Sequence, residues 1–313
     1  MDLTQRFAAF GLVPVIVIDD AAHAVPLARA LAMGGLPVAE ITCRTPAAMQ
    51  AIRNVAAEAP DVLVGAGTVL TVAQAAMALD AGAAFIVAPG FNPEVVGWCR
   101  NQGVPVVPGV DSPSAIEGAL AFGLELLKFF PAEALGGIGF LKAMAGPYAG
   151  VRFMPTGGIH ADNLAGYLAW DRVAACGGTW LADRSLVAAG RFDEIAARTR
   201  RAMAAVLGLR LERVELFGPA SPESESLCAL LAALLGADAA SATVSLAAPA
   251  PYEQEAHRLG RLICTTRDPA RAAAFFARLG VADLGSAGLG GTAGGEAETG
   301  LAGFTLRLAP RRS

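Results

Sequence analysis

The stretch Val13-Pro14-Val15-Ile16-Val17-Ile18-Asp19-Asp20 decides between two folds. Its first six residues form an apolar run that is too short for a helix, so they predict a buried strand. In an open, doubly wound sheet that binds a dinucleotide, the loop after the first strand is rich in glycine. Here that loop begins with two aspartates. The open sheet is therefore the alternative, and a closed barrel is the favoured fold.

Seven similar runs follow at intervals of about 20 to 25 residues, each succeeded by a stretch rich in Ala and Leu. They begin near Val38, Val62, Ala84, Val104, Leu126, Val151 and Arg172. Short buried strands that alternate with helices predict a parallel sheet with crossover helices. Eight such units close most simply as a (β/α)8 barrel, also called a TIM barrel. We therefore expect an α/β barrel over residues 1–207, with tight loops because the block is shorter than the ~250 residues typical of this fold.

Residues 208–313 follow a different pattern and predict a small α+β accessory module, of ferredoxin-like type, whose role the sequence does not reveal. Strands are expected at 213–217, 242–247, 261–266 and 304–308, helices at 222–235 and 268–279, and a Gly-rich loop at 285–303. The strand endings TVSLAAP and TLRLAP suggest two βαβ half-units. We find no catalytic cluster here and expect regulation or assembly, with an inert appendage as the alternative.

Composition limits the classes of function. The chain of 313 residues is 54% hydrophobic and carries a formal net charge of −4, which argues against disorder and against nucleic acid as a partner. No apolar run reaches the ~20 residues of a membrane helix, and the first residues lack the order of a secretory signal. These features predict a soluble cytoplasmic protein. The five cysteines and three histidines lack ligand spacings, so we expect neither a metal site nor a disulfide framework.

Polar side chains alternate along the second run, in Glu40-Ile41-Thr42-Cys43-Arg44. Alternate residues of a strand share a face, so a carboxylate, a hydroxyl and a guanidinium should point the same way. The structural alternative for the glutamate is an internal ion pair or a strand end in solvent.

Lys128 lies in the apolar sixth run, between Leu127 and Phe129, and is one of only two lysines in the chain. Surroundings of hydrocarbon favour a neutral amine over an ammonium ion. A neutral amine attacks carbonyl carbon and can form a Schiff base. The alternative is a structural ion pair, for which Glu40 could be the partner because even-numbered strands share layers of the barrel interior. Both interpretations predict the same contact.

Three glycine-containing loops follow strand ends, at residues 65–68, 155–158 and 177–179. Glycine lets a backbone approach a ligand closely, and the loops after strands seven and eight are the usual phosphate site of a TIM barrel. As turns, however, these loops need no ligand.

Six motifs in order resemble the aldolases for 2-keto-3-deoxy-6-phosphogluconate (KDPG) and 4-hydroxy-2-oxoglutarate (KHG). They are VPVIVI (13–18), EITCRT (40–45), GAGTVL (65–70), LLKFFPAE (126–133), AGPYAGVRFMPTGGI (145–159) and GGTWL (177–181). The resemblance covers about residues 8–205. It implies a class I, metal-independent aldolase of the Entner–Doudoroff pathway, built as a (β/α)8 barrel and assembled as a homotrimer.

The resemblance also assigns roles to residues. It implies that Lys128 forms the Schiff base, with no other cofactor, and that Glu40 moves protons. Arg44 and Thr68 would bind the substrate carboxylate. The phosphate would be bound by Gly157, Gly158 and Thr179, where threonine replaces a serine of the family. We expect Pro89, Phe130 and Thr156 to line the pocket.

The expected reaction is cleavage of KDPG to pyruvate and glyceraldehyde 3-phosphate. KHG and the galactonate-derived epimer of KDPG are alternative substrates, because discrimination at one carbon depends on hydroxyl contacts that the sequence does not reveal. A further alternative from another class is a barrel without catalysis, in which the C-terminal module binds a ligand or partner.

Overall fold

The structure is a computed structural model that describes residues 2–208, 210–217, 243–247, 258–266, 268, 271–272, 297–301 and 304–310. The chain forms two compact units, Met1–Val206 and Leu207–Ser313. No helix among the described residues is long and apolar enough to cross a membrane.

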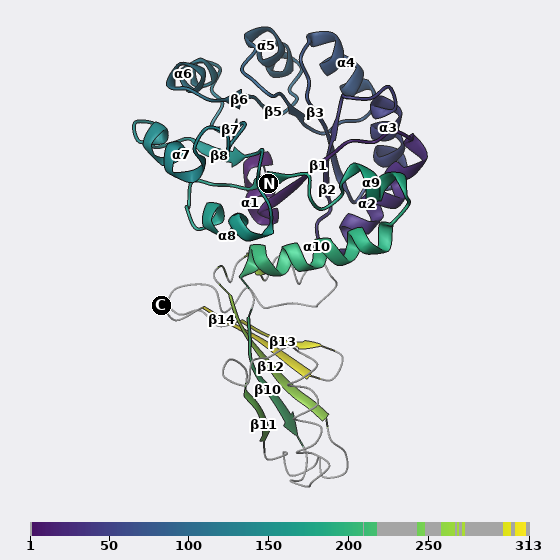
Figure 1. The fold of residues 1–313 in the computed structure, drawn as a ribbon, viewed down its shortest axis with the longest axis vertical. Helices are drawn as coiled ribbons and strands as arrows, with labels where there is room; N and C mark the ends of the chain where they lie inside the picture. The colour runs from purple at the N-terminus through teal and green to yellow at the C-terminus, as the bar shows by residue number, and fades with distance from the viewer. Residues whose placement is uncertain are drawn as a thin grey trace. The chain divides into compact units, whose positions relative to one another are not determined.

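The first unit is a curled parallel sheet surrounded by helices (Figure 1). Its strands are β1 (Leu12–Ile16), β2 (Val38–Thr42), β3 (Leu63–Gly67), β4 (Ile86–Val87), β5 (Val106–Val107), β6 (Gly109–Val110), β7 (Leu126–Phe129), β8 (Arg152–Pro155) and β9 (Cys176–Gly178). The pairing runs β5-β4-β3-β2-β1-β9 in one sheet and β6-β7-β8 in the other. Parallel bridges from Phe153 to Val173 and from Thr156 to Gly177 connect β8 to β9.

Segments β5 and β6 are two parts of one run that Pro108 interrupts, since proline has no N–H group to donate to a neighbouring strand. Taken together they pair with β4 on one side and β7 on the other. The sheet therefore curls round in the order of the sequence, with every described pairing in it parallel. This is the predicted (β/α)8 barrel type, and each of the eight expected runs contains or adjoins an observed strand.

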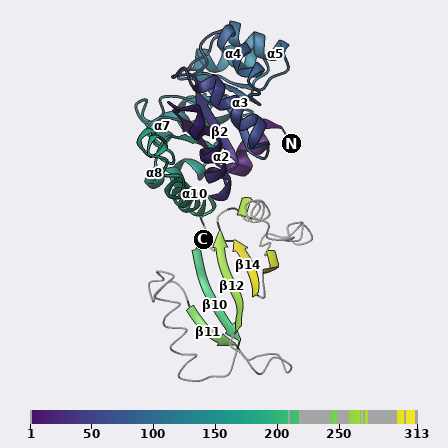
Figure 2. The same cartoon turned by 90° about the vertical axis from the view of Figure 1, so that its right-hand side faces the viewer.

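Apart from α1, which precedes β1, the helices follow the strands and lie outside the ring, as Figure 2 shows for α2 and α3 around β2. They are α1 (Leu3–Phe10), the short 3-10 helix η1 (Ala21–His23), α2 (Ala24–Met33), α3 (Ala48–Glu58), α4 (Val72–Asp80), α5 (Pro93–Asn101), α6 (Pro113–Ala121), α7 (Gly137–Ala145), α8 (Ala161–Leu168), α9 (Arg184–Ala188) and α10 (Phe192–Leu207). Side chains of Thr71, Asn92 and Asp183 accept hydrogen bonds from N–H groups in the first turns of α4, α5 and α9. Such caps satisfy amides that would otherwise lack partners, which explains where these helices begin.

The helix α1 precedes the first strand and covers the end of the barrel at which the strands start. Its Phe7 is fully buried and packs edge-on against Phe85, with ring centroids 5.2 Å apart. The opposite end, where the strands finish, is left to the loops. In barrels of this type the chemistry takes place at that end.

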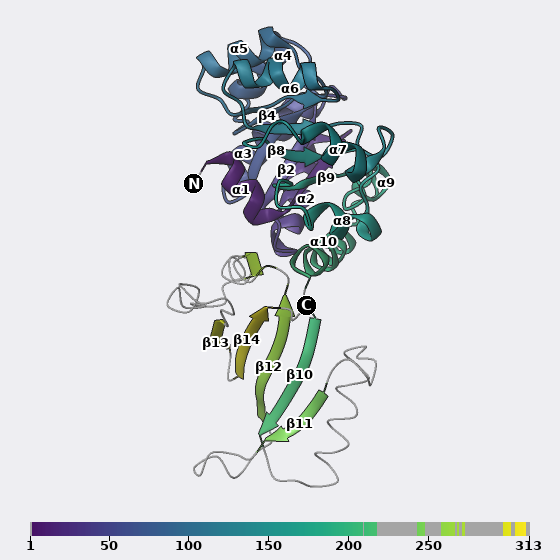
Figure 3. The ribbon, with the colours of Figure 1, turned by 90° about the vertical axis from the view of Figure 1, so that its left-hand side faces the viewer.

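The second unit contains a mixed sheet of five strands in the order β11-β10-β12-β14-β13, in which β10, β12 and β14 lie side by side (Figure 3). The strands are β10 (Arg210–Phe217), β11 (Thr243–Ala247), β12 (Arg258–Thr266), β13 (Ala297–Leu301) and β14 (Phe304–Pro310). Strands β10 and β11 pair in parallel, as do β12 and β14, while β10 and β12 are antiparallel.

Two expectations for this unit need correction. A ferredoxin-like module is a split βαβ, in which another strand separates the two parallel ones, but here β10 and β11 are direct neighbours. The segment 285–303 is not loop throughout, because β13 pairs with β14 across residues 297–301. The helix expected at 222–235 and most of the one at 268–279 lie outside the described residues.

Candidate active site

A lysine and a glutamate form an ion pair inside the barrel. Lys128 on β7 and Glu40 on β2 are 4% and 0% exposed, and Lys128 Nζ lies 3.4 Å from Glu40 Oε1. Taking two charges out of water costs several kcal/mol per ion, so a buried pair is poor evidence of a stabilising role. The ammonium also lies over the ring of Phe130, 5.3 Å from its centroid. The contact expected from both interpretations of Lys128 is present.

One carboxylate oxygen of Glu40 has no protein partner. Glu40 Oε2 is buried and accepts no hydrogen bond from any described residue. A buried acceptor without a partner is costly, and such groups are found where a ligand or a water completes the site. Glu40 therefore has one oxygen on the lysine and the other available for a proton.

Glycines stand beside both side chains, and one of them makes room for Glu40. Glu40 stands in register with Gly65 on β3, and Lys128 stands in register with Gly109 on β6. A Cβ atom on Gly67 would overlap the Glu40 carboxylate. A Cβ atom on Gly109 would overlap the backbone of Pro89. Glycine residues without side chains therefore border the interior around the pair. Pro89, one of the expected pocket residues, lies against Gly109 on β6, the strand beside Lys128.

Arg44 and Thr68 meet at the rim above this pair. Strand β2 ends at Thr42, so Arg44 lies in the following turn rather than on the strand. Its Nε donates a hydrogen bond of 3.3 Å to Thr68 Oγ1. Thr68 has φ 55°, a left-handed backbone that is uncommon for a residue with a Cβ. The hydroxyl of Thr42 is engaged elsewhere, since it donates to Ile16 O on β1 at 2.8 Å.

The glycine loop after β8 lies next to the end of β9. Gly177 and Gly178, which the sequence places in a loop, belong to that strand. Gly157 and Gly158 have φ values of 97° and 77°, which side chains rarely tolerate. The bridge between Thr156 and Gly177 brings this loop beside the end of β9, where Thr179 is exposed. Thr156 itself is 4% exposed, and its hydroxyl donates to Met154 O at 3.3 Å. The predicted phosphate residues are therefore neighbours at the C-terminal end of the barrel.

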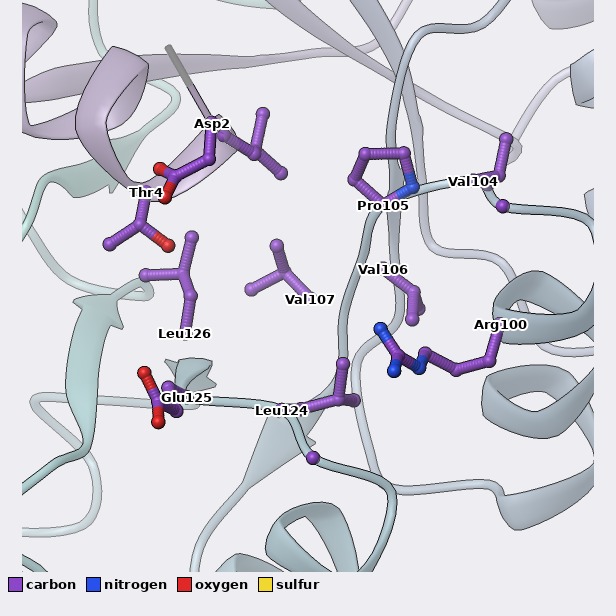
Figure 4. Close-up of a pocket in the computed structure, with 13 residues that line it drawn as sticks. Asp2, Thr4, Arg100, Val104, Pro105, Val106, Val107, Leu124, Glu125 and Leu126 are labelled. Carbon is purple, nitrogen blue, oxygen red and sulfur yellow. The ribbon is translucent and has the colours of Figure 1, made fainter.

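A pocket lies at the opposite end of the barrel from this site (Figure 4). It has a volume of about 370 Å³ and lies between the start of α1 and the residues that lead into β5 and β7. Asp2, Arg100 and Glu125 on its wall are exposed. None of the predicted site residues lines it. Among the described residues, no three His, Cys, Asp or Glu side chains gather closely enough to hold a metal ion.

Comparison with known proteins shows which family the chain belongs to. The family model for KDPG and KHG aldolase matches residues 3–198. The chain belongs to this family. The 2-dehydro-3-deoxy-phosphogluconate aldolase of Treponema pallidum is 51% identical over 192 residues, which are 61% of this chain and 91% of the relative.

Solved structures of the KDPG/KHG aldolase family resemble the barrel. KDPG aldolase from Legionella pneumophila, with pyruvate captured at low pH as a covalent carbinolamine intermediate, has a TM-score of 0.63 and 39% identity, covering 64% of this chain and 98% of its own. The Zymomonas mobilis enzyme with 3-phosphoglycerate has a TM-score of 0.60 and 38% identity, covering 64% and 95%. Each likeness covers a share of this chain close to that of the first unit.

The sequence did not predict two features of the site. The sequence places Gly65 and Gly67 in a loop after the third run, but both lie on β3. A glycine inside a strand often marks a close approach of another group, and that signal was available. The hydrogen bond from Tyr167 on α8 to Glu133 after β7 could not be read from a pattern, because it joins residues 34 positions apart.

Proposed function

We propose that this chain is a class I aldolase that cleaves KDPG to pyruvate and glyceraldehyde 3-phosphate through an imine on Lys128. The observation that carries the proposal is the buried pair of Lys128 and Glu40, in which Glu40 retains an oxygen without a partner. Membership of the family supports it, as does the relative that has been captured with pyruvate as a carbinolamine.

The first half of the reaction belongs to Lys128. Its ammonium transfers a proton to Glu40, and the free amine adds to the C2 ketone of the substrate to give a carbinolamine. Glu40 returns this proton to the carbinolamine hydroxyl, which leaves as water, so that Glu40 is again a carboxylate and a protonated imine remains. The protonated imine withdraws electrons from C3. The aromatic ring of Phe130 lies beside the amine, and glycine residues border the interior around the pair.

The second half of the reaction belongs to Glu40. Its carboxylate removes the C4 hydroxyl proton, directly or through a water, and the C3–C4 bond breaks. The bonding electrons move to the imine nitrogen and form an enamine, while glyceraldehyde 3-phosphate leaves. Glu40 returns the proton to C3, and water hydrolyses the resulting imine to pyruvate and free Lys128.

Binding groups at the rim orient the substrate. The guanidinium of Arg44 and the hydroxyl of Thr68, already in contact, would bind the carboxylate next to the ketone. The loop at Gly157 and Gly158, with Thr179 beside it, would bind the phosphate at the far end of the substrate.

The decisive experiment is reduction by borohydride in the presence of pyruvate, followed by peptide mapping. The chain provides its own internal control, because Lys142 is the one other lysine and is exposed on α7. We expect a stable adduct on Lys128 and none on Lys142. Absence of an adduct on Lys128 would leave only the non-catalytic role of the barrel.

Substrate preference is tested by comparing kcat/KM for KDPG, for its galactonate-derived epimer and for KHG. We expect the phosphorylated acids to be preferred over KHG because of the glycine loops. A preference for KHG would refute the assignment of Gly157, Gly158 and Thr179 to phosphate. We also propose a homotrimer, which light scattering of the full chain would test.

A further inference from the structure

The loop that follows Lys128 rests on the loop proposed to bind phosphate. Ala132 N donates to Thr156 O at 2.8 Å, and Glu133 N donates to Gly157 O at 3.1 Å. A Cβ atom on Gly158 would lie 2.6 Å from both Cβ and Cγ of Glu133. The aliphatic stem of Glu133 therefore covers Gly158, and its carboxylate is one bond further on.

The Glu133 carboxylate is directed away from this loop by Tyr167. The phenol of Tyr167, 2% exposed, donates a hydrogen bond to Glu133 Oε1. A Cβ atom on Gly137 would lie 3.2 Å from that oxygen and 3.2 Å from the Tyr167 hydroxyl, which places the contact at the start of α7. Burial, and then the hydrogen bond to Glu133, raise the pKa of Tyr167 well above its usual range. The phenol thus stays protonated and can donate throughout the working range of pH.

The backbone of the glycine loop is held independently of this contact. Asn163 lies one helical turn before Tyr167 on α8, and its Nδ2 donates to Gly158 O at 3.0 Å. Its Oδ1 accepts from His160 N at 2.9 Å. Removal of the Tyr167 hydroxyl therefore frees the Glu133 carboxylate while these bonds to the loop remain.

We propose that Tyr167 is a positioning residue for phosphate recognition, whose hydroxyl holds the Glu133 carboxylate away from the loop at Gly157 and Gly158. The inference rests on the proposed function, because it assumes that this loop binds the phosphate. A carboxylate released from Tyr167 can swing about the stem that covers Gly158. A negative charge there repels a phosphate, and so weakens binding of the phosphorylated substrate.

The test is Tyr167→Phe, which removes the hydroxyl alone. We expect KM for KDPG to rise about tenfold, whereas kcat for KDPG and kcat/KM for KHG change less than about twofold. The matched control is Tyr148→Phe, which breaks another tyrosine–glutamate hydrogen bond, of 2.9 Å to Glu117, next to the start of β8. We expect this control to leave KM unchanged.

A second variant separates repulsion from a general loosening of the structure. In Tyr167→Phe/Glu133→Gln the side chain is still free to move but carries no charge, so KM for KDPG should return to within about threefold of wild type. A double variant with KM as high as that of Tyr167→Phe would overturn the proposal. So would a Tyr167→Phe enzyme with unchanged KM, or one that loses kcat/KM equally on KDPG and KHG.

The wild-type enzyme distinguishes this failure from failure of the proposed function. If wild type forms the borohydride adduct and prefers KDPG to KHG, a negative result with Tyr167→Phe refutes the role of Tyr167 alone. If wild type forms no adduct, or does not prefer KDPG, the proposed function or its phosphate loop is wrong, and the inference about Tyr167 is wrong with it.

Discussion

The two ends of the barrel both carry charged side chains, but only one end buries them. Where the strands finish, Lys128 and Glu40 are almost completely inaccessible and face each other. Where the strands begin, Asp2, Arg100 and Glu125 surround a pocket and remain exposed. A solvated charge costs the fold little, whereas a buried pair must be held by the surrounding structure. Burial, and not the size of the cavity, therefore distinguishes the candidate active site.

The largest loss of activity is expected from Lys128→Met at the buried end of the barrel. This substitution keeps the bulk of the side chain and removes the amine. We expect turnover to fall by at least about 10⁴-fold, because no imine can form. Borohydride with pyruvate should give no adduct, and thermal melting should verify that the variant is folded. Lys142→Arg is the control and should retain turnover, since Lys142 is exposed. Substantial activity in Lys128→Met would show that the pair is structural.

Glu40→Gln should have the second largest effect. The amide can still accept a hydrogen bond from Lys128 but cannot take a proton from the substrate, so turnover should fall roughly 10²–10⁴-fold. The imine with pyruvate should still form during a long incubation, because water can take the Lys128 proton in place of Glu40, and borohydride trapping measures it. Near-normal turnover would mean that another group or a water carries the proton.

Gly67→Ala tests whether the bare backbone beside Glu40 matters. The new methyl group would overlap the Glu40 carboxylate and displace it, and we expect kcat to fall about 10–100-fold. Gly139→Ala on α7 is the matched control, because its Cβ would meet nothing within 4 Å. That control should leave kcat unchanged and stabilise the fold slightly, since alanine is the better helix former. Equal kcat in the two variants would contradict this account of Gly67.

At the other end of the barrel, Glu125→Gln should change kcat and KM less than about twofold. The carboxylate is exposed and belongs to the end of the fold at which catalysis does not take place. A steady-state measurement on KDPG suffices. A tenfold loss of kcat/KM would show that the pocket of Figure 4 affects substrate binding or turnover.

The smallest effect is expected from truncation after residue 208. Every residue assigned to the site lies in the first unit, and α10 ends at Leu207. The truncated chain should keep near-native kcat, measured together with its oligomeric state. A truncated chain that folds and assembles but is inactive would show that the second unit completes the site.

The barrel could be predicted because each of its strands can be recognised from a few consecutive residues. Each strand is a short apolar run, and burial on both faces of a parallel sheet makes such runs readable. The same holds for Lys128 and Glu40, since a charge within an apolar run is conspicuous. Strand alternation predicts that Arg44 shares a strand face with Glu40. That reasoning does not apply to Arg44, because β2 ends before it at Thr42.

What could not be predicted depends on conformation or on pairing between distant segments. The contact between Arg44 and Thr68 accompanies a left-handed backbone at Thr68, which no pattern of residue types signals for threonine. In the second unit the repeated strand endings suggest two βαβ half-units. The structure pairs β10 with β11 and β12 with β14 in parallel, while most of the segments that connect them lie outside the described residues. The order of these pairs in the sheet did not follow, because it depends on contacts between residues far apart in the chain.

The glycines in register with Glu40 and Lys128 have a consequence for how the family can change. Gly65 and Gly109 carry no functional group, yet a Cβ atom on Gly65 would overlap the Phe85 ring, and one on Gly109 would overlap Pro89 O. Selection for new substrates is therefore constrained at positions that a search for polar or charged side chains would pass over. A deep mutational scan should find these two positions among the least tolerant in the barrel, and an engineer who wants a bulkier acceptor aldehyde should keep them as glycine and vary the rim instead.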